Sequence, residues 1–474
     1  MMNTPRLQRQ ARPATPGIVH LGPGAFFRAF IAPYTDEVMA AAGGDWGLIA
    51  VSLQSTTAHD QLAPQNCLYS ALERGPNGDT VKLIHAVSDV LVAPRDPAAI
   101  VTIMANPAIR IVSLTVTEKG YCRDPQTGEM LHGHPDIRHD LTNLDRPRSA
   151  IGFIVAGLKA RYDGGLPAFT VLTCDNLPSN GAMVRKVVNA FAHEIDPALA
   201  DWIDGHATFP STMVDRITPA TTPQDIETLA QSEGYLDHAA VVHEPFRQWV
   251  IEDRFAAGRP DWDAAGAQFV DNVEAHELMK LRCLNGTHSA LAYLGYLAGH
   301  ETISDAVADR PFEELCVTLW RDDILPTLQT PHGEDLPAYC RSLMTRYRNP
   351  AIRHRTWQIA MDGSQKLPQR ILGTIKDRLA QGAVPLGLCL VVAAWMRYVG
   401  GSDETGAPID VKDPLAEYLA AATRTDDPVG ALLAMDSVFE PDLAAHPDFN
   451  AAVRAAYQRL CQDGSRASVA AFVS

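Results

Sequence analysis

One segment in the second half of the chain contains residues that could transfer a proton to or from a reacting oxygen. Residues 273–289 read VEAHELMKLRCLNGTHS, and Lys280 in this segment is flanked by leucine and methionine. Burial among such side chains would lower the pKa of the lysine from its ordinary value near 10.4, and a positively charged ring nearby would lower it further. A fall of roughly three units would make Lys280 a usable general acid or base near neutral pH. A solvated surface lysine is the alternative interpretation.

An asparagine and a histidine follow this lysine at spacings that suit a shared site. Asn285 and His288 are three positions apart, so they can share one face of a helix. Lys280 and Asn285 are five apart, which is about 140° round a regular α-helix. The two converge only if the helix is interrupted, and the Asn285-Gly286 pair is a plausible break. The alternative is that Asn285 only caps a helix.

A glycine-containing loop near the start of the chain has the pattern of a dinucleotide site. The apolar run 17–21 leads into Gly22-Pro-Gly24-Ala25-Phe26, followed by Phe27 where the usual fingerprint has a third glycine. The two glycines allow a tight turn and let the backbone approach a pyrophosphate, which a helix beginning near Phe26 would face with its N-terminus. We therefore predict that Gly22, Gly24, Ala25 and Phe26 bind a cofactor. Glycines that serve only a turn are the alternative.

The end of the second expected strand bears on which dinucleotide binds. This strand ends in a carboxylate in many NAD sites and near basic residues in NADP sites. The chain has Gln54-Ser55-Thr56 there, with neither signature. Gln54 could hydrogen-bond a ribose hydroxyl, and the lack of Arg or Lys nearby in the sequence favours NAD.

The elements that must position these residues fall into two halves. In the first half, apolar segments typical of buried strands alternate with helical segments, which predicts a parallel, doubly wound, Rossmann-like sheet. The strand-like segments are 17–21, 46–53, 81–90, 110–116 and 167–173, and the helical ones 26–42, 97–104 and 148–162. After about residue 272 helical periodicity dominates, over 273–299, 311–327, 335–347, 369–380, 385–399, 413–424 and 447–462.

This pattern predicts an α/β fold with two domains. We expect a NAD-binding Rossmann-like domain over 1–272 and a mainly α-helical substrate and catalytic domain over 273–474. The active site should lie in the cleft between the two domains.

Composition narrows the class of partner. The formal net charge of −16 argues against a nucleic-acid or anionic-membrane partner, and no apolar stretch is long enough to span a bilayer. The eight cysteines include no CxxC pair, which fits reduced thiols in a cytoplasmic protein. His132 and His134 could clip a metal, but a surface loop is the simpler interpretation, and we predict no metal site. The polar N-terminus lacks the apolar core of a signal peptide and is interpreted as a frayed lead-in.

Six stretches together resemble the mannitol dehydrogenase family, the polyol-specific long-chain dehydrogenases. The resemblance runs from Gly17 to about Arg370 and is specific only when the stretches are taken together. They are HLGPGAFFRAF at 20–30, LTVTEKGY at 114–121, TCDNLPSNG at 173–181, FPSTMVDRITP at 209–219, ELMKLRCLNGTHS at 277–289 and DGSQKLPQR at 362–370.

The resemblance implies a role for each matching residue. Lys280 would be the catalytic acid/base, and Asn176 and Asn285 would supply the two amides that stabilise the developing alkoxide. His288 would donate to a substrate oxygen, and Glu277 would relay protons between the lysine and solvent. The resemblance further implies a zinc-independent reaction with NAD, with Asp215, Gln358 and Lys366 in the substrate pocket.

The residues around Lys366 bear on the substrate. Gln358 stands where polyol-oxidising members tend to carry arginine, and the surrounding stretch looks more like the mannonate oxidoreductase branch. Arg353, His354, Arg355 and Lys366 would form a positive field for a sugar-acid carboxylate, although Arg353 and Arg355 could equally be surface charges.

We therefore expect NADH-dependent reduction of a keto-sugar acid such as D-fructuronate to D-mannonate, by a monomer or small homo-oligomer. The alternative is a mannitol 2-dehydrogenase or related arabinitol dehydrogenase acting on a neutral 2-ketose. A non-catalytic NAD-binding sensor would be expected to lack Lys280 or the amides, and a zinc alcohol dehydrogenase would need a Cys/His ligand set.

Overall fold

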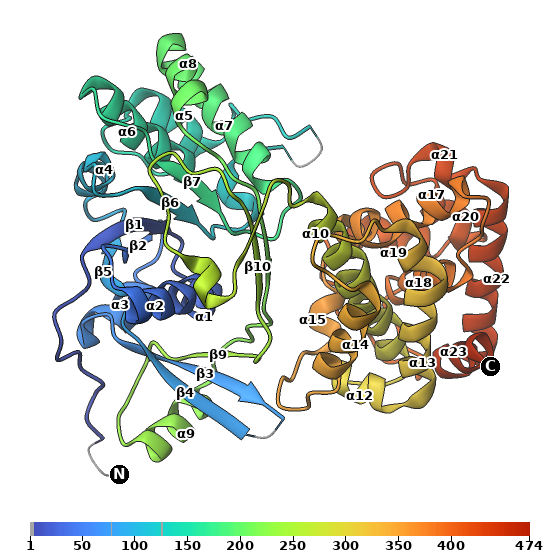
Figure 1. The fold of residues 1–474 in the computed structure, drawn as a ribbon. Helices are drawn as coiled ribbons and strands as arrows, with labels where there is room; N and C mark the ends of the chain where they lie inside the picture. The colour runs from blue at the N-terminus through green and yellow to red at the C-terminus, as the bar shows by residue number, and fades with distance from the viewer. Residues whose placement is uncertain (1–3, 77, 125–126) are drawn as a thin grey trace. The chain divides into compact units, whose positions relative to one another are not determined.

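The computed structural model describes residues 4–76, 78–124 and 127–474 and divides the chain into two compact units (Figure 1). The first unit is Met1–Glu274 and the second is Ala275–Ser474.

A five-stranded parallel sheet forms the centre of the first unit. Its order is β5-β2-β1-β6-β7, and every neighbouring pair is parallel. Counted along the chain within this sheet the order is third, second, first, fourth, fifth, as in doubly wound nucleotide-binding sheets. The prediction of a Rossmann-like parallel sheet is confirmed. The strands are β1 (Pro16–Leu21), β2 (Gly47–Ser52), β5 (Val87–Val92), β6 (Ile111–Leu114) and β7 (Thr170–Thr173).

Helices cover both faces of this sheet because successive strand residues point to opposite sides. Val19 and Ile49 pack with one set of helices, whereas Ile18 and Leu48 pack with the other. Figure 1 shows the two sets on opposite sides of the strands. The first set is α4 (Pro97–Ala105), α6 (Ala150–Asp163) and α7 (Asn180–Ile195); the second is α1 (Ala25–Ala29) and α2 (Ile31–Ala42).

The single helix predicted over 26–42 is interrupted at Phe30, whose backbone leaves the helical region at φ −129° and ψ −75°. Pro33 explains the interruption, because a proline inside a continuous helix removes a hydrogen bond and clashes with the preceding turn. Restarting the helix at Ile31 places Pro33 in the first turn of α2, where its missing N–H is not needed.

Two small sheets, which the sequence pattern did not reveal, complete the first unit. They have the orders β4-β3-β9 and β11-β10-β8, and the β-rich segment predicted over 81–90 divides between β4 and β5. Their strands are β3 (Tyr69–Gly75), β4 (Gly78–Ile84), β8 (Thr212–Asp215), β9 (Val241–His243), β10 (Gln248–Glu252) and β11 (Gln268–Val270). The remaining helices are α3 (Thr57–Leu62), α5 (Pro135–Thr142), α8 (Pro197–His206) and α9 (Pro223–Glu233), with 3₁₀ turns at Ala63–Gln65, Glu118–Tyr121 and Trp262–Ala265.

The lead-in that we interpreted as frayed is tied down beyond its first residues. Arg9 is 8% exposed, and its guanidinium donates to the backbone oxygens of Asn66, His85 and Val87. Buried backbone acceptors need donors, and this arginine supplies three.

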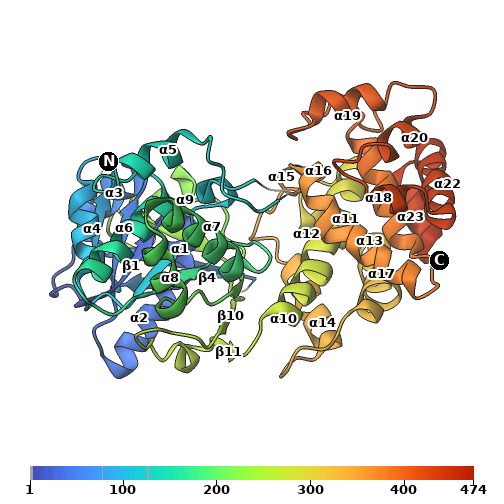
Figure 2. The same cartoon turned by 90° about the horizontal axis from the view of Figure 1, so that it is seen from above.

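The second unit is built from helices around α18 (Leu386–Tyr398), which is buried along almost its whole length. Both views show α22 beside it (Figures 1 and 2), and the two helices pack together. The α-helices are α10 (Glu274–Met279), α11 (Thr287–Ala290), α12 (Ile303–Ala308), α13 (Arg310–Thr318), α14 (Leu336–Tyr347), α15 (Thr356–Ala360), α16 (Gly363–Leu367), α17 (Gly373–Ala380), α18, α19 (Ala416–Ala422), α20 (Pro428–Leu433), α21 (Pro441–Ala444), α22 (Pro447–Asp463) and α23 (Ser465–Val473). Four π-helical segments lie at Lys280–Gly286, Leu291–Gly295, Leu319–Ile324 and Pro368–Leu372, and a 3₁₀ turn at Leu325–Thr327.

Within residues 4–76, 78–124 and 127–474, no helix has both the length and the apolar character required to cross a membrane. The eight cysteines are free thiols, as the sequence predicts, and only Cys461 is exposed.

Candidate active site and cofactor pocket

The loop after β1 has the backbone that a dinucleotide site requires. Gly22 adopts a φ of +91°, and a Cβ at this position would lie 2.3 Å from the Thr115 carbonyl oxygen. Only glycine fits there without strain. A Cβ on Gly24 would meet nothing within 4 Å, so the backbone at Gly24 faces open space that a ligand could use. Phe27, in the place of the third glycine, packs on His20 of β1 with ring centroids 3.9 Å apart.

This loop borders a cavity of about 630 Å³ at the carboxyl ends of β1, β2 and β6. Ligands of open parallel sheets bind at this edge, where the strand order reverses between β1 and β6. Of the predicted cofactor residues, Gly22, Gly24 and Gln54 line the cavity. Ala25 and Phe26 begin α1 and are partly buried. Other lining residues are Pro23, Arg28, Ser52, Leu53, Ser55, Thr57, Ala58, Gln61, Thr115, Val116, Thr117, Lys119, Gly120, Cys122, His134, Asp136, Arg148, Ser149 and Ala150.

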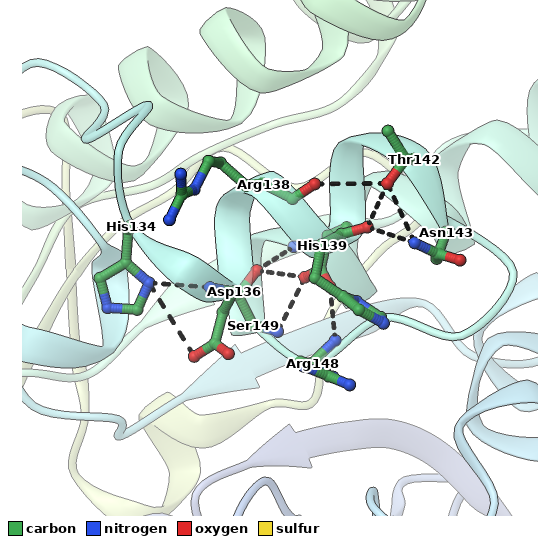
Figure 3. A network of polar contacts seen from close by, with 10 residues as sticks. His134, Asp136, Arg138, His139, Thr142, Asn143, Arg148 and Ser149 are labelled. Carbon is green, nitrogen blue, oxygen red and sulfur yellow. Dashed lines mark hydrogen bonds and ion pairs between the residues drawn. The ribbon is translucent and has the colours of Figure 1, made fainter.

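A buried carboxylate fixes the wall of this cavity at the start of α6 (Figure 3). Asp140, at the end of α5, accepts hydrogen bonds from the backbone N–H groups of Arg148 and Ser149 at 2.9 and 2.8 Å. The Ser149 hydroxyl also donates to Asp140 at 2.7 Å and caps α6 by accepting from Gly152 N–H. Because Asp140 is inaccessible to solvent, these bonds hold Arg148 and Ser149 firmly beside the cavity.

A second cavity, of about 580 Å³, shares Leu53, Gln54, Asp136 and Arg148 with the first. Arg146 also lines it. The argument that no cation lies near Gln54 is therefore wrong for the folded chain, because the α5–α6 connection brings two arginines from more than 90 positions away. The sequence window could not show a contact made at that separation.

His134 has a structural role in the fold. His134 Nδ1 accepts from the Asp136 N–H at 3.2 Å and so caps α5. The described residues contain no group of three or more His, Cys, Asp or Glu that could hold a metal ion.

Two predicted site residues of the first unit lie at strand ends. Asn176 is exposed just after β7, in a turn that Asp175 fixes by accepting from Val116 N–H at 2.9 Å and Thr117 N–H at 3.0 Å. Asp215 is 3% exposed at the end of β8. Both residues belong to the first unit, so their convergence with Lys280 remains a prediction.

In the second unit, the helix that carries Lys280 does not break at Asn285-Gly286 as we expected. Residues Lys280–Gly286 instead form a π-helix. A π-helix bonds residue i to residue i+5, so residues five apart lie about one turn apart. This widening brings Lys280 and Asn285 to the same side without a break, and π-helical turns of this kind are frequent at functional sites.

Side chains from two other helical segments satisfy the carbonyl groups in this π-helix. The Trp320 indole donates to the Cys283 oxygen at 2.9 Å, and the Tyr347 hydroxyl donates to the Leu284 oxygen at 3.1 Å. The Thr287 hydroxyl also donates to the Cys283 oxygen, at 2.6 Å. These bonds replace partners that regular α-helical bonding would supply, and they support the wider turn.

Lys280, Asn285 and His288 are all buried, at 6%, 8% and 6% exposure. Glu277 lies three positions before Lys280 on α10 and is half-buried, a spacing that allows the two side chains to meet. The structure thus groups the four predicted catalytic residues of this unit on one helical stretch.

His288 has a polar atom that no protein group satisfies. Its Nε2 is buried with no hydrogen-bond partner among the described residues, and the Nδ1 of neighbouring His354 is in the same state. The two rings meet edge to face at 5.2 Å between centroids. Burial and surrounding positive charges lower the pKa of His288 well below its usual range, and the pKa of His354 to about 4. Both imidazoles are therefore neutral at pH 7, and each offers one N–H donor and one acceptor.

The positive charges around these rings come partly from residues that the sequence interpretation did not select. The pKa of His288 is lowered by the charges of Arg346, Arg370 and Lys280. The pKa of His354 is lowered by those of Arg370, Lys366 and Arg346. Arg370 was missed although it ends the DGSQKLPQR stretch four positions after Lys366, a spacing that favours one helical face.

Two of the arginines expected in the positive field lie elsewhere. Arg353 and Arg355 are exposed and lie 3.2 and 3.7 Å from a Glu301 carboxylate oxygen. They are surface ion-pair residues, which was the alternative interpretation. Gln358 is exposed on α15, and its role in substrate binding remains a prediction.

Comparison with known proteins agrees with these features. The mannitol dehydrogenase Rossmann domain matches residues 16–264, and the mannitol dehydrogenase C-terminal domain matches residues 272–461. The chain belongs to the mannitol dehydrogenase family. The predicted resemblance is confirmed, and so is the combination of a Rossmann-like sheet with a helical region.

The relatives of this chain are named for different substrates. The chain is 48% identical to the D-mannonate oxidoreductase of Escherichia coli (strain K12), over 96% of this chain and 95% of the relative. It is 39% identical to a mannitol 2-dehydrogenase of Aspergillus fumigatus, over 98% of this chain and 94% of the relative. The solved ternary complex of Pseudomonas fluorescens mannitol 2-dehydrogenase with NAD and D-mannitol matches with a TM-score of 0.88 and 38% identity, covering 99% of this chain and 97% of that chain. This member of the family is therefore an oxidoreductase.

Proposed function

We propose that this oxidoreductase uses NAD(H) to interconvert a keto-sugar acid and its sugar acid, D-fructuronate and D-mannonate, with Lys280 as general acid/base and no metal. The observation that carries the proposal is the concentration of positive charge around His288. Lys280, Arg346 and Arg370 all act on this buried imidazole. A sugar acid brings one carboxylate to these positive charges, whereas a neutral ketose brings no charge to them.

The residues of the first unit fit a dinucleotide. The positive φ of Gly22 and the open space at Gly24 let the backbone approach a pyrophosphate, and Gln54 can hydrogen-bond the adenosine ribose. When bound, the reduced nicotinamide would supply the hydride for the carbonyl carbon. The similar mannitol 2-dehydrogenase structure, a ternary complex with NAD and D-mannitol, supports this choice of cofactor.

The residues of the second unit would handle the charge and the proton. Negative charge develops on the carbonyl oxygen during reduction, and the amide of Asn285, together with that of Asn176 from the first unit, would stabilise it. Lys280 would then give its proton to this oxygen, and Glu277 would pass a replacement proton from solvent. His288 would donate to a neighbouring substrate oxygen through its unpartnered nitrogen. In the oxidative direction, neutral Lys280 would remove the hydroxyl proton.

A neutral polyol substrate is the second candidate, because the 38% identical mannitol 2-dehydrogenase structure is a complex with D-mannitol. Two observations favour the sugar acid. The D-mannonate oxidoreductase has the higher identity, and Gln358 replaces the arginine expected in polyol enzymes. The free thiols support a reducing compartment such as the cytoplasm.

Oxidation of NADH by the purified protein with D-fructuronate, D-tagaturonate, D-fructose and D-xylulose tests the proposal. We expect D-fructuronate to give the highest kcat/KM. Equal or better turnover of D-fructose would reject the sugar-acid assignment and favour the polyol enzyme. Unchanged activity after exhaustive treatment with a chelator is expected, and a loss that added metal restores would contradict the metal-free mechanism.

A further inference from the structure

We propose that Arg370 binds the carboxylate of the substrate and is the residue that makes a sugar acid a better substrate than a neutral ketose. This inference rests on the proposed function. It assigns the carboxylate to a residue outside the predicted set, in which Lys366 was the pocket cation.

Arg370 has few partners for a partly buried guanidinium. Its Nη1 lies 3.4 Å from the Ser289 hydroxyl oxygen, and it forms no ion pair within the part of the chain that the structure describes. A guanidinium carries five N–H donors in a fixed fork that matches a carboxylate. Most of these donors therefore have no acceptor among the described residues, and a carboxylate could take two of them side by side.

Lys366 is in the opposite situation. Its ammonium donates to the backbone oxygens of Met361 at 2.5 Å and Ile359 at 3.4 Å. The carboxylates of Asp362 and Asp413 also act on it and partly compensate its charge. Two of its three donors are thus in use, so Lys366 is better suited to holding the α15–α16 connection than to binding a ligand.

The position of Arg370 suits a substrate that also contacts His288. Arg370 lies on the π-helix Pro368–Leu372, which packs on the π-helix Lys280–Gly286. Its hydrogen-bond partner Ser289 follows His288 in the chain, and its charge acts on both His288 and His354. A carboxylate on Arg370 would therefore lie beside two buried imidazole nitrogens that no described protein group satisfies.

Charge balance separates the two substrate classes at this point. A buried cation without a counterion is unfavourable, and a bound carboxylate relieves this while forming charge-assisted hydrogen bonds. The hydroxymethyl group of a ketose can accept a hydrogen bond there but brings no counter-charge. Loss of Arg370 should therefore change the ratio of kcat/KM for fructuronate to kcat/KM for fructose. It should change the rate of hydride and proton transfer on either substrate less.

The test measures kcat/KM for D-fructuronate and for D-fructose with NADH, in the wild type and in Arg370→Gln, Arg370→Lys and Lys366→Met. We expect Arg370→Gln to lower the fructuronate-to-fructose ratio by about 10- to 150-fold, mainly through the KM for fructuronate. Arg370→Lys should retain part of the ratio, because the charge remains but the fork is lost. Lys366→Met should change the ratio only a few-fold. Arg310→Gln, an exposed arginine of α13, is the control and should change nothing.

The pH dependence of the wild type provides a test that needs no variant. Burial and the nearby Arg370 lower the pKa of Lys366 to about 8, against the opposing effect of Asp362 and Asp413. His354, which Lys366 also faces, has a pKa of about 4 and stays neutral between pH 7 and 9. If Lys366 held the carboxylate, the ratio would fall as the pH rises through 8 and the ammonium loses its proton. An arginine stays charged over this range, so we expect the ratio to persist to pH 9. The acid/base step is common to both substrates, so its pH dependence cancels in the ratio.

The outcomes separate this inference from the function on which it rests. No preference for fructuronate in the wild type would reject the proposed function. A clear wild-type preference with an equal loss for both substrates in Arg370→Gln would leave the function standing and show that Arg370 only stabilises the packed π-helices. If Arg370→Gln does not fold, the wild-type ratio decides: persistence to pH 9 supports Arg370, and a fall through pH 8 overturns it.

Discussion

The two units of this protein build their parts of the site by different means. In the first unit the backbone makes the pocket: Gly22 turns where no side chain fits, and the site side chains Gln54 and Asn176 are exposed. In the second unit, buried side chains make the site, with Lys280 and His288 each 6% exposed. A change in the glycine loop should therefore act through cofactor binding, and a change at Lys280 through the chemical step.

The difference also lies in how each site is held. The glycine loop directly follows β1, which lies between two parallel strands, so the whole sheet holds its position. The Lys280 site depends on a π-helix whose carbonyls are satisfied by Trp320 and Tyr347. Single hydrogen bonds therefore matter more in the second unit.

Lys280→Ala should give the largest effect. We expect turnover to fall by about 100- to 10,000-fold, the usual contribution of a general acid/base, while NADH affinity stays within a factor of about two. Steady-state kinetics and quenching of protein fluorescence by NADH measure the two quantities. Lys376→Ala is the matched control, because Lys376 is an exposed lysine of the same unit that pairs with Glu440. A Lys280→Ala enzyme within a few-fold of wild type would show that another group moves the proton.

In the first unit, Gly22→Ala and Gly24→Ala should differ in their effects on stability and on NADH binding. Alanine at position 22 would keep a φ of +91° and place its Cβ 2.3 Å from the Thr115 oxygen, so we expect at least about 1–3 kcal/mol of lost stability. Alanine at position 24 meets no protein atom within 4 Å and should leave the melting temperature unchanged while weakening NADH binding. Calorimetry and NADH titration of both variants measure this. Equal melting temperatures for the two would contradict the backbone-built pocket.

Tyr347→Phe tests the support of the π-helix. The change removes the donor to the Leu284 oxygen and the partner of the Thr287 hydroxyl, a loss of about 0.5–1.5 kcal/mol, because the Leu284 oxygen keeps the Thr287 backbone N–H. We expect kcat to fall more than KM changes, because Lys280 and Asn285 would lose their shared side. Tyr398→Phe makes the same chemical change at a buried hydroxyl with no described hydrogen-bond partner and should be close to neutral. Identical unfolding curves and kinetics for the two variants would rule out this support.

Cofactor choice should show the smallest effect. We expect NADH to be preferred over NADPH by only about 2- to 10-fold, the value of one neutral hydrogen bond from Gln54. Arg146 and Arg148 line the same cavity, which keeps the preference small. Competition kinetics with the two cofactors measure the ratio, and Gln54→Ala should reduce it toward one. A preference for NADPH would mean that the arginines bind a 2′-phosphate.

Much of the fold could be predicted because its signals are local. The apolar runs that became β1, β2, β6 and β7 and the helical periodicity after residue 272 both report burial of nearby residues. The strands β8, β9 and β11 were missed because each spans only three or four residues, too short for a period to register.

In the candidate site too, local features could be predicted and contacts between distant residues could not. Lys280, Asn285 and His288 were found because they share one short motif, but the π-helix that aligns them depends on Trp320 and Tyr347, which are distant in sequence. Arg148 and Arg370 were missed for a related reason, since the fold brings them to their sites. The prediction that a helix break aligns Lys280 with Asn285 was wrong, because these tertiary hydrogen bonds could not be foreseen from the sequence.

The central claim is that the positive charge around His288 selects a carboxylate. The most direct measurement is kcat/KM for D-fructuronate against D-fructose, with saturating NADH and wild-type enzyme at pH 7. A charge-assisted hydrogen bond contributes about 1.5–3 kcal/mol, so fructuronate should be favoured by roughly 10- to 150-fold if the contact persists in the transition state. Equal kcat/KM values for the two substrates would contradict the claim and identify the enzyme as a dehydrogenase of neutral polyols.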